Sequence, residues 1–197
     1  MAVAGRRWTM HNGFSRLHHT PLGRWWEARM LRHLELTEVD LEVPGLGEEC
    51  LTVAFISDVH VGFFLSQRTL VDIANRVGAR RPDLIIFGGD LLVGELSELD
   101  LLAPLLSLEA PLGKYAVLGN HEYHPFRLGP HKAAARAAAR AAGGSAALWA
   151  ELLGPFGIRV LANEGDRLDV GETTLWIAGV DDAHESTARA GSAIRGR

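Results

Sequence analysis

The sequence predicts an α/β fold in which parallel strands alternate with helices. Three short, nearly continuous apolar runs have the composition of strands that are buried on both faces. The segments between these runs show the apolar spacing of amphipathic helices, and polar residues follow each run where a strand should end. Strand–helix–strand order implies right-handed crossovers and therefore parallel strands. The three runs are residues 51–56, 84–87 and 114–118.

Ahead of the first buried strand, we expect an arm and one further strand. Residues 1–33 mix basic and aromatic side chains, and a short helix is expected there from Trp25 onward. Apolar residues alternate over residues 34–43, which predicts a strand whose register slips near Thr37. Residues 44–47 read Pro-Gly-Leu-Gly, a sequence typical of a turn.

Two helices are expected between the three buried strands. Ser66 can cap the first helix, whose apolar residues recur at helical spacing as far as Val77. Residues 97–100 resemble a capping box for the second helix, which should extend to Leu108. Pro104 lies within that stretch and predicts either a late start or a kink.

Two more helices and three more strands are expected after the third buried run. An alanine-rich helix is predicted over residues 133–142 because alanine is the best helix former. Ser145 can cap another helix that ends at Gly154. The predicted strands cover residues 158–161, 167–170 and 173–180, with a hairpin turn between the last two. We therefore predict an arm over residues 1–33, an α/β domain over residues 34–182 and an irregular tail over residues 183–197.

Composition excludes several classes of protein. The 197 residues suit one domain with terminal segments, and a net charge of -4 gives no evident nucleic-acid surface. The single cysteine, Cys50, rules out an internal disulfide and a Cys-rich metal motif. No apolar run reaches the ~18 residues of a membrane span, and no signal-peptide pattern is present. We therefore expect a cytoplasmic location.

The arm is the feature that favours contact with a membrane. Between Arg16 and His33 it combines basic side chains with Trp25 and Trp26, a mixture that can lie on an anionic lipid surface. The alternative is an arm that packs on the domain with its arginines in solvent. Because the apolar face is short, the sequence favours this alternative over peripheral membrane contact.

The polar residues that follow the buried strands form a candidate set of metal ligands. Asp58 and His60 follow the first strand, and residues two apart in a strand point to one face. Asp90 follows the second strand, and Asn120 and His121 follow the third. Thirty residues separate His60 from Asp90 and Asp90 from Asn120, about one strand–helix–strand unit. A two-metal site needs such oxygen and imidazole ligands, with one carboxylate as the bridge.

Each cluster taken alone has a more ordinary explanation. Asp-x-His is common in proteins, and Gly-Gly-Asp is more often a turn than a site. Gly-Asn-His-Glu could equally be a turn with Asn120 at positive φ. Their order, their spacing and their placement after three apolar strands together predict a two-metal site for phosphoester hydrolysis.

These motifs resemble those of the calcineurin-like metallophosphoesterase superfamily. The matching motifs are Asp58-x-His60, Gly89-Asp90 and Gly-Asn-His-Glu at residues 119–122. The surrounding residues resemble the bacterial branch, which includes membrane-associated phosphodiesterases and lipid-A-pathway pyrophosphatases. The resemblance extends from about residue 34 to residue 182 and implies a four-layer α-β-β-α sandwich built on two facing sheets.

The resemblance also implies a role for each candidate residue. Asp58 and His60 would bind a first metal ion, Asp90 would bridge both ions, and Asn120 would bind the second. His121 would stabilise the transition state or protonate the leaving oxygen. A metal-bridging hydroxide would attack the phosphorus of a phosphoester substrate in line. The implied cofactors are two divalent ions, of manganese, iron or zinc.

The sequence departs from the family pattern after Asn120. Family members carry a further histidine and then a Gly-His-x-His motif. Here the later histidines are His124, His131 and His184, and none lies in that context. The sequence therefore predicts a truncated chain whose sandwich is incomplete at the C-terminus. Two outcomes stay open: a metal-dependent phosphodiesterase or phosphatase, and a catalytically inactive remnant.

Overall fold

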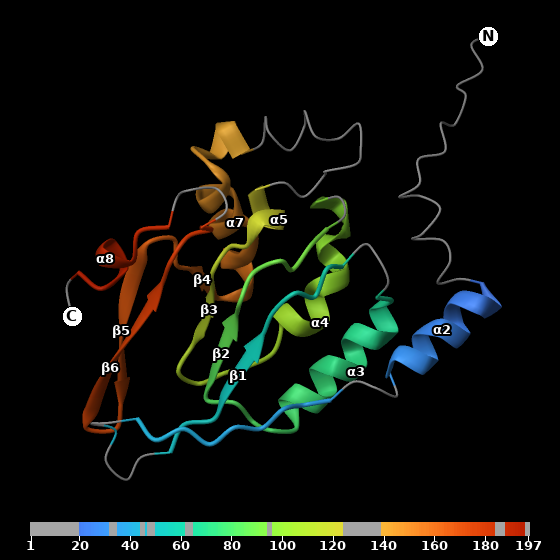
Figure 1. Cartoon of the computed structure of the whole chain (residues 1–197), viewed down its shortest axis with the longest axis horizontal. Coiled ribbons are helices and arrows are strands. Elements are labelled where there is room, and N and C mark those ends of the chain that lie inside the picture. Colours follow the sequence, from blue (N-terminus) through green and yellow to red (C-terminus); the bar gives the residue numbers. More distant parts are fainter. Residues whose placement is uncertain are drawn as a thin grey trace.

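A four-stranded parallel sheet and a two-stranded antiparallel ribbon form the frame of the molecule (Figure 1). The computed structural model describes residues 20–31, 35–43, 46, 50–61, 65–93, 96–123, 139–183 and 188–195. The sheet has the order β1-β2-β3-β4, with strands Val53–Ile56, Leu84–Phe87, Lys114–Ala116 and Ile158–Val160. The ribbon consists of β5, Glu164–Val170, and β6, Thr173–Gly179. The predicted α/β class is confirmed.

Every neighbouring pair in the four-stranded sheet is parallel, as the strand–helix order predicts. Val53 pairs with Leu84, and Lys114 lies opposite both Ile85 and Ile158. The carboxyl ends of the four strands therefore lie along a single edge of the sheet. Binding sites of open parallel sheets form at this edge.

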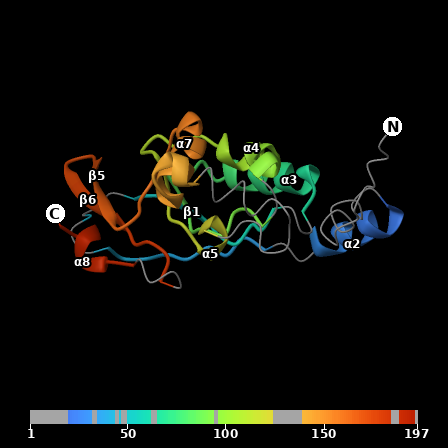
Figure 2. The same cartoon turned by 90° about the horizontal axis from the view of Figure 1, so that it is seen from above.

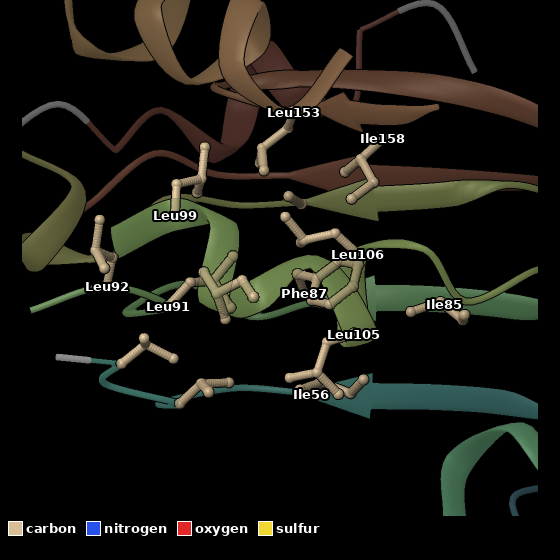
Figure 3. Packing of buried hydrophobic residues seen from close by; sticks show 14 of the residues in the cluster. Ile56, Ile85, Phe87, Leu91, Leu92, Leu99, Leu105, Leu106, Leu153 and Ile158 are labelled. Atoms are coloured by element: carbon tan, nitrogen blue, oxygen red, sulfur yellow. The ribbon is translucent and has the colours of Figure 1, made fainter. Parts of the chain in front are cut away.

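Helices cover one face of the sheet. They are α3, Gln67–Gly78, α4, Ala103–Leu106, and α7, Ser145–Leu153, and Figure 2 shows them on one side of the molecule. Ile56, Phe87 and Ile158 of the strands pack with leucines of the helices in the main core (Figure 3). Ser66 caps α3, as predicted, by accepting a hydrogen bond from the backbone N–H of Thr69.

The β5–β6 ribbon covers part of the other face. Leu168 and Val170 of β5 pack with Leu84, Tyr115 and Leu161 in a second apolar cluster. The short helix α8, Ala190–Ala193, lies on the far side of the ribbon, where Trp176 donates its indole N–H to the Ala193 carbonyl over 3.1 Å. Among the described residues, the layers thus follow the order helix, sheet, ribbon, helix. The ribbon layer consists of the two strands β5 and β6.

The ribbon leaves the β1 end of the sheet uncovered. Val53 and Phe55 stand on the same face as the second cluster, because their partners Leu84 and Ile86 belong to it. Yet Val53 is 46% exposed and Phe55 is 67% exposed. The layer over β3 and β4 therefore does not extend over β1 in the described part of the chain.

The strand predicted over residues 34–43 is wrong for the residues that the structure describes, 35–43. These residues form no strand, and Leu36, Val39, Leu41 and Val43 are all exposed. Apolar alternation shows that a segment could bury one face. A strand also needs a hydrogen-bonded neighbour, and no described strand pairs with this segment.

Two predicted helices begin at different residues from those expected. Residues 96–102 form a 3-10 turn, and the α-helix starts at Ala103 with Pro104 in its first turn, which confirms the late start. α7 begins at Ser145 itself, so the prediction that Ser145 caps it is wrong. Gly144 occupies the cap with a φ of 135°, a conformation open to glycine.

The remaining sequence predictions are covered only in part by the structure. Helix α2, Pro21–Leu31, replaces the shorter helix expected from Trp25 onward. Of the alanine-rich helix, residues 139–142 are described and helical. The rest of that helix, arm residues 1–19 and three histidines, His124, His131 and His184, lie outside the described residues. None of the described helices combines the length and the hydropathy that a membrane-spanning helix needs.

Candidate metal centre

The segments that follow β1 and β2 run side by side beyond the ends of the strands. The backbone N–H of Asp58 donates to the Gly89 carbonyl over 3.1 Å, and that of His60 donates to the Asp90 carbonyl over 3.0 Å. An isolated parallel bridge between Val61 and Leu92 continues the pairing. These bonds bring the first two sequence clusters together at the carboxyl edge of the sheet.

Three of the candidate ligands have a left-handed backbone. The φ angles are 55° at Asp58, 47° at His60 and 53° at Asp90. Non-glycine residues rarely adopt this region, although Asp and His do so more often than most. Such conformations cost about 1–3 kcal/mol each and gather at functional sites. The backbone at these candidate ligands is therefore held in an energetically unfavourable left-handed conformation.

Asp58 and His60 converge, but not for the reason that the sequence suggested. β1 ends at Ile56, so neither residue belongs to the strand. Their two left-handed turns bring Nε2 of His60 to 3.6 Å from Oδ1 of Asp58. Ser57 donates its hydroxyl to the other carboxylate oxygen of Asp58.

His60, Asp90 and His121 form a group of three possible metal ligands, the one such group found among the described residues. Their ligand atoms all lie within 4.8 Å of one another. The rings of His60 and His121 meet edge to face, with centroids 4.9 Å apart and an interplanar angle of 89°. Two imidazoles and a carboxylate are donors that suit manganese, iron and zinc. The residues present therefore fit a divalent cation.

The third sequence cluster lies on the short helix α5, Asn120–Tyr123. Asn120 opens the helix and does not have a positive φ, so the alternative of a left-handed turn at Asn120 is wrong. The backbone N–H of His121 donates to Oδ1 of Asp90 over 2.9 Å. This bond joins α5 to the loop after β2 and brings the His121 ring into the group.

Two glycines allow the loops after β2 and β3 to approach closely. A Cβ atom on Gly119 would lie 2.3 Å from Oδ1 of Asp90. One on Gly89, whose φ is 90°, would lie 2.5 Å from the backbone nitrogen of Gly119. Any larger residue at either position would displace Asp90 or α5. The glycines of these motifs are thus needed for the geometry of the site.

Glu122 joins the two loops, and sequence reasoning assigned it no role. Its side chain is only 3% exposed, and it accepts backbone N–H bonds from Asp90, Gly119 and Leu91 over 2.7, 2.8 and 2.9 Å. Burial raises the pKa of Glu122 to about 7, although these three bonds oppose the rise. Trp149 of α7 donates its indole N–H to the Glu122 carbonyl over 2.9 Å. The sequence signal was an acidic residue directly after His121, with nothing to show that it points inward.

Comparisons with known proteins agree with this geometry. A family model described as calcineurin-like phosphoesterase matches residues 51–181. This range contains the strand ends, the three-residue cluster and Glu122. No solved structure matches the chain at a significant level.

The relatives come from bacteria and from animals. An uncharacterized metallophosphoesterase of Aquifex aeolicus is 36% identical over 159 residues, which cover 80% of this chain and 51% of that protein. A transmembrane protein with metallophosphoesterase domain of Danio rerio is 29% identical over 75% of this chain and 31% of its own. The UDP-2,3-diacylglucosamine pyrophosphatase LpxG of Chlamydia muridarum is 35% identical over 46% of this chain and 29% of its own. The chain thus spans about half or less of these relatives.

Proposed function

This chain belongs to the calcineurin-like phosphoesterase family, and from that premise we propose that it hydrolyses phosphoester bonds with two divalent metal ions. One observation carries the proposal: the ligand atoms of His60, Asp90 and His121 lie within 4.8 Å of one another. They do so at the carboxyl edge of a parallel sheet, where such sites form. Left-handed backbone at two of these residues supports it further.

Each residue has a proposed part in this site. Asp58 and His60 would hold one cation, Asn120 would hold the other, and the Asp90 carboxylate would contact both. When bound, two such cations neutralise phosphoryl charge and supply hydroxide by lowering the pKa of water. His121 lies against His60 and Asp90, close enough to stabilise the transition state or to protonate the leaving oxygen.

The surrounding chain holds these side chains in place before any substrate binds. Oδ1 of Asp90 accepts the His121 backbone N–H, while Glu122 accepts the backbone N–H of Asp90 itself. The carboxylate and the backbone N–H of Asp90 are thereby both held relative to α5. A carboxylate positioned in this way needs little reorganisation when charge develops in the transition state.

Hydrolysis of bis-p-nitrophenyl phosphate with added manganese tests the proposal. We expect metal-dependent turnover that falls at least ~100-fold in Asp90→Ala. Asp169→Ala is a matched control, since Asp169 is an exposed acid on β5. Turnover that survives Asp90→Ala would contradict the assignment of the site. Absence of any metal-dependent turnover would instead favour the alternative, a catalytically inactive chain.

A second proposal concerns contact between α2 and anionic lipid. Leu22 is 67% exposed and Trp25 is 57% exposed, although both are large apolar residues. Arg24 and Arg29 are exposed on the same helix, a composition that suits a membrane surface. Vesicle co-sedimentation should fall sharply when Trp25 and Trp26 are both replaced with alanine, and unchanged sedimentation would contradict the proposal. The cytoplasmic location expected from the sequence stays a prediction.

A further inference from the structure

The end of β6 reaches the same edge of the sheet as the candidate metal centre. β4 ends at that edge, and β5 starts there after a three-residue connection. Because β5 and β6 are antiparallel and Glu164 pairs with Gly179, β6 must end at the edge where β5 begins. A Cβ on Gly179 would lie 2.4 Å from Cβ of Leu161. The ribbon therefore lies against the sheet at the edge that carries the candidate site.

Asp181 follows this close approach and is held by polar contacts on both sides. The residue is 8% exposed, and its Oδ1 accepts the backbone N–H of Asp182 over 2.9 Å. Its own backbone N–H donates to Oδ1 of Asn163, in the connection between β4 and β5, over 3.3 Å. These bonds fix the direction in which the Asp181 carboxylate points.

The carboxylate points at α5. Tyr123 donates its hydroxyl to Oδ1 of Asp181 over 2.5 Å. Tyr123 is the last residue of that helix, two residues after His121 and three after Asn120. The bond thus joins the end of β6 to the helix that carries two of the proposed site residues, across 58 positions of sequence.

Helix α5 depends on such external contacts for its orientation. It has four residues, and a helix this short satisfies almost none of its own backbone groups. Glu122 binds its start to the loops after β2 and β3, and Trp149 binds the Glu122 carbonyl. Asp181 provides the contact at the tyrosine that ends the helix.

We propose that Asp181 is a positioning residue which, through the Tyr123 hydroxyl, sets the orientation of α5 and so places Asn120 and His121. This inference rests on the proposed metal centre and extends it to a residue outside the proposed ligand set. Partners that orient metal ligands typically contribute about 10–100-fold to metal affinity. One hydrogen bond at the end of the helix should lie at the lower end of that range.

The chain provides a matched control for this bond. It contains two tyrosines, and each donates its hydroxyl to an aspartate. Tyr115 donates to Asp166 over 3.0 Å, in a contact between β3 and the ribbon. Tyr115→Phe removes a bond of the same kind without touching α5. A change specific to Tyr123→Phe therefore reports on the position of α5 rather than on general stability.

Two measurements test the proposal together. One is calorimetric titration with Mn²⁺, and the other is hydrogen exchange of residues 117–123 in the metal-free chain. Tyr123→Phe and Asp181→Ala should each weaken manganese binding about tenfold and speed exchange in α5. Asp181→Asn keeps an acceptor oxygen for the tyrosine and should stay within about twofold of the parent. Tyr115→Phe should leave manganese affinity unchanged and should speed exchange in α5 less than Tyr123→Phe does.

Three outcomes would overturn the proposal. The first is parental manganese affinity and parental exchange in a folded Tyr123→Phe chain. The second is an equal loss in Tyr115→Phe, since the effect would then be general destabilisation. The third is a loss in Asp181→Asn as large as that in Asp181→Ala. If the parent itself binds no manganese, the proposed metal centre fails, and the exchange measurement alone then decides whether Asp181 orients α5.

Discussion

Replacement of Glu122 with alanine should destabilise the metal-free chain by about 3–5 kcal/mol. The side chain accepts three backbone N–H groups, those of Asp90, Leu91 and Gly119. Each buried donor left without an acceptor costs about 1–3 kcal/mol. Water that enters the vacated space can satisfy some of these donors. The loss of stability should therefore lie near the lower end of the range obtained by adding the costs of the three donors.

Glu122→Gln should cost less than Glu122→Ala, about 1–3 kcal/mol. Oε2 of Glu122 accepts two of the three bonds, and Oε1 accepts the third. A glutamine amide keeps one acceptor oxygen and places a donor opposite the remaining N–H group. The expected order of stability is therefore parent, glutamine, alanine.

Urea unfolding followed by tryptophan fluorescence measures these differences, because Trp149 is fully buried and donates to the Glu122 carbonyl. The slope of the transition should stay constant if only stability changes. Glu151→Ala, at an exposed position on α7, should stay within about 0.5 kcal/mol of the parent. If the free energy of unfolding of Glu122→Ala also lay within about 0.5 kcal/mol of the parent, the role assigned to Glu122 would be refuted.

Three further predictions concern the site, the ribbon and the uncovered sheet face. Gly119→Ala places a Cβ 2.3 Å from Oδ1 of Asp90, so manganese affinity measured by calorimetry should fall at least ~10-fold; retained affinity would contradict the close approach. Tyr115→Phe removes the bond to Asp166 and should cost about 1 kcal/mol in urea unfolding at pH 8. Burial and the Asp166 bond raise the pKa of Tyr115, so the folded state holds this proton more tightly than the unfolded state. The parent should therefore lose stability as the pH rises above 10, and Tyr115→Phe should lose less. The same dependence of unfolding free energy on pH in both chains would contradict this. Phe55→Ser should change the free energy of unfolding by less than about 0.5 kcal/mol, because Phe55 is 67% exposed; a loss above about 2 kcal/mol would show that this face is covered.

Local patterns were sufficient to predict most elements of the sheet and its helices. The apolar run at residues 84–87 matches β2 at both ends, and Ser66 caps α3 by the expected hydrogen bond. These features depend on neighbouring residues, so a short window of sequence contains the needed information. The late start of the helix at Ala103 likewise follows from Pro104 alone.

Predictions failed where the outcome depended on distant parts of the chain. Residues 35–43 have the alternation of a strand but no described partner strand, and alternation cannot provide one. Asp58 and His60 converge through left-handed turns fixed by bonds to the loop after β2, which strand periodicity does not describe.

Part of the candidate site was equally beyond local reasoning. The clusters around Asp58, Asp90 and Asn120 could be found in the sequence, because polar residues directly after buried strands are a local signal. The supporting bonds could not, since Glu122 binds Asp90 across 32 positions and Tyr123 binds Asp181 across 58. Such pairs become visible only when the strands are placed in order.

Titration of manganese into the metal-free chain tests the central claim most directly. The geometry of His60, Asp90 and His121 predicts saturable binding that weakens at least ~10-fold in Asp90→Asn, a substitution that keeps the size of the side chain but removes its charge. Equal affinity in the parent and in Asp90→Asn, or no saturable binding by a folded parent, would contradict the claim that a metal centre forms around Asp90 at the carboxyl edge of the sheet.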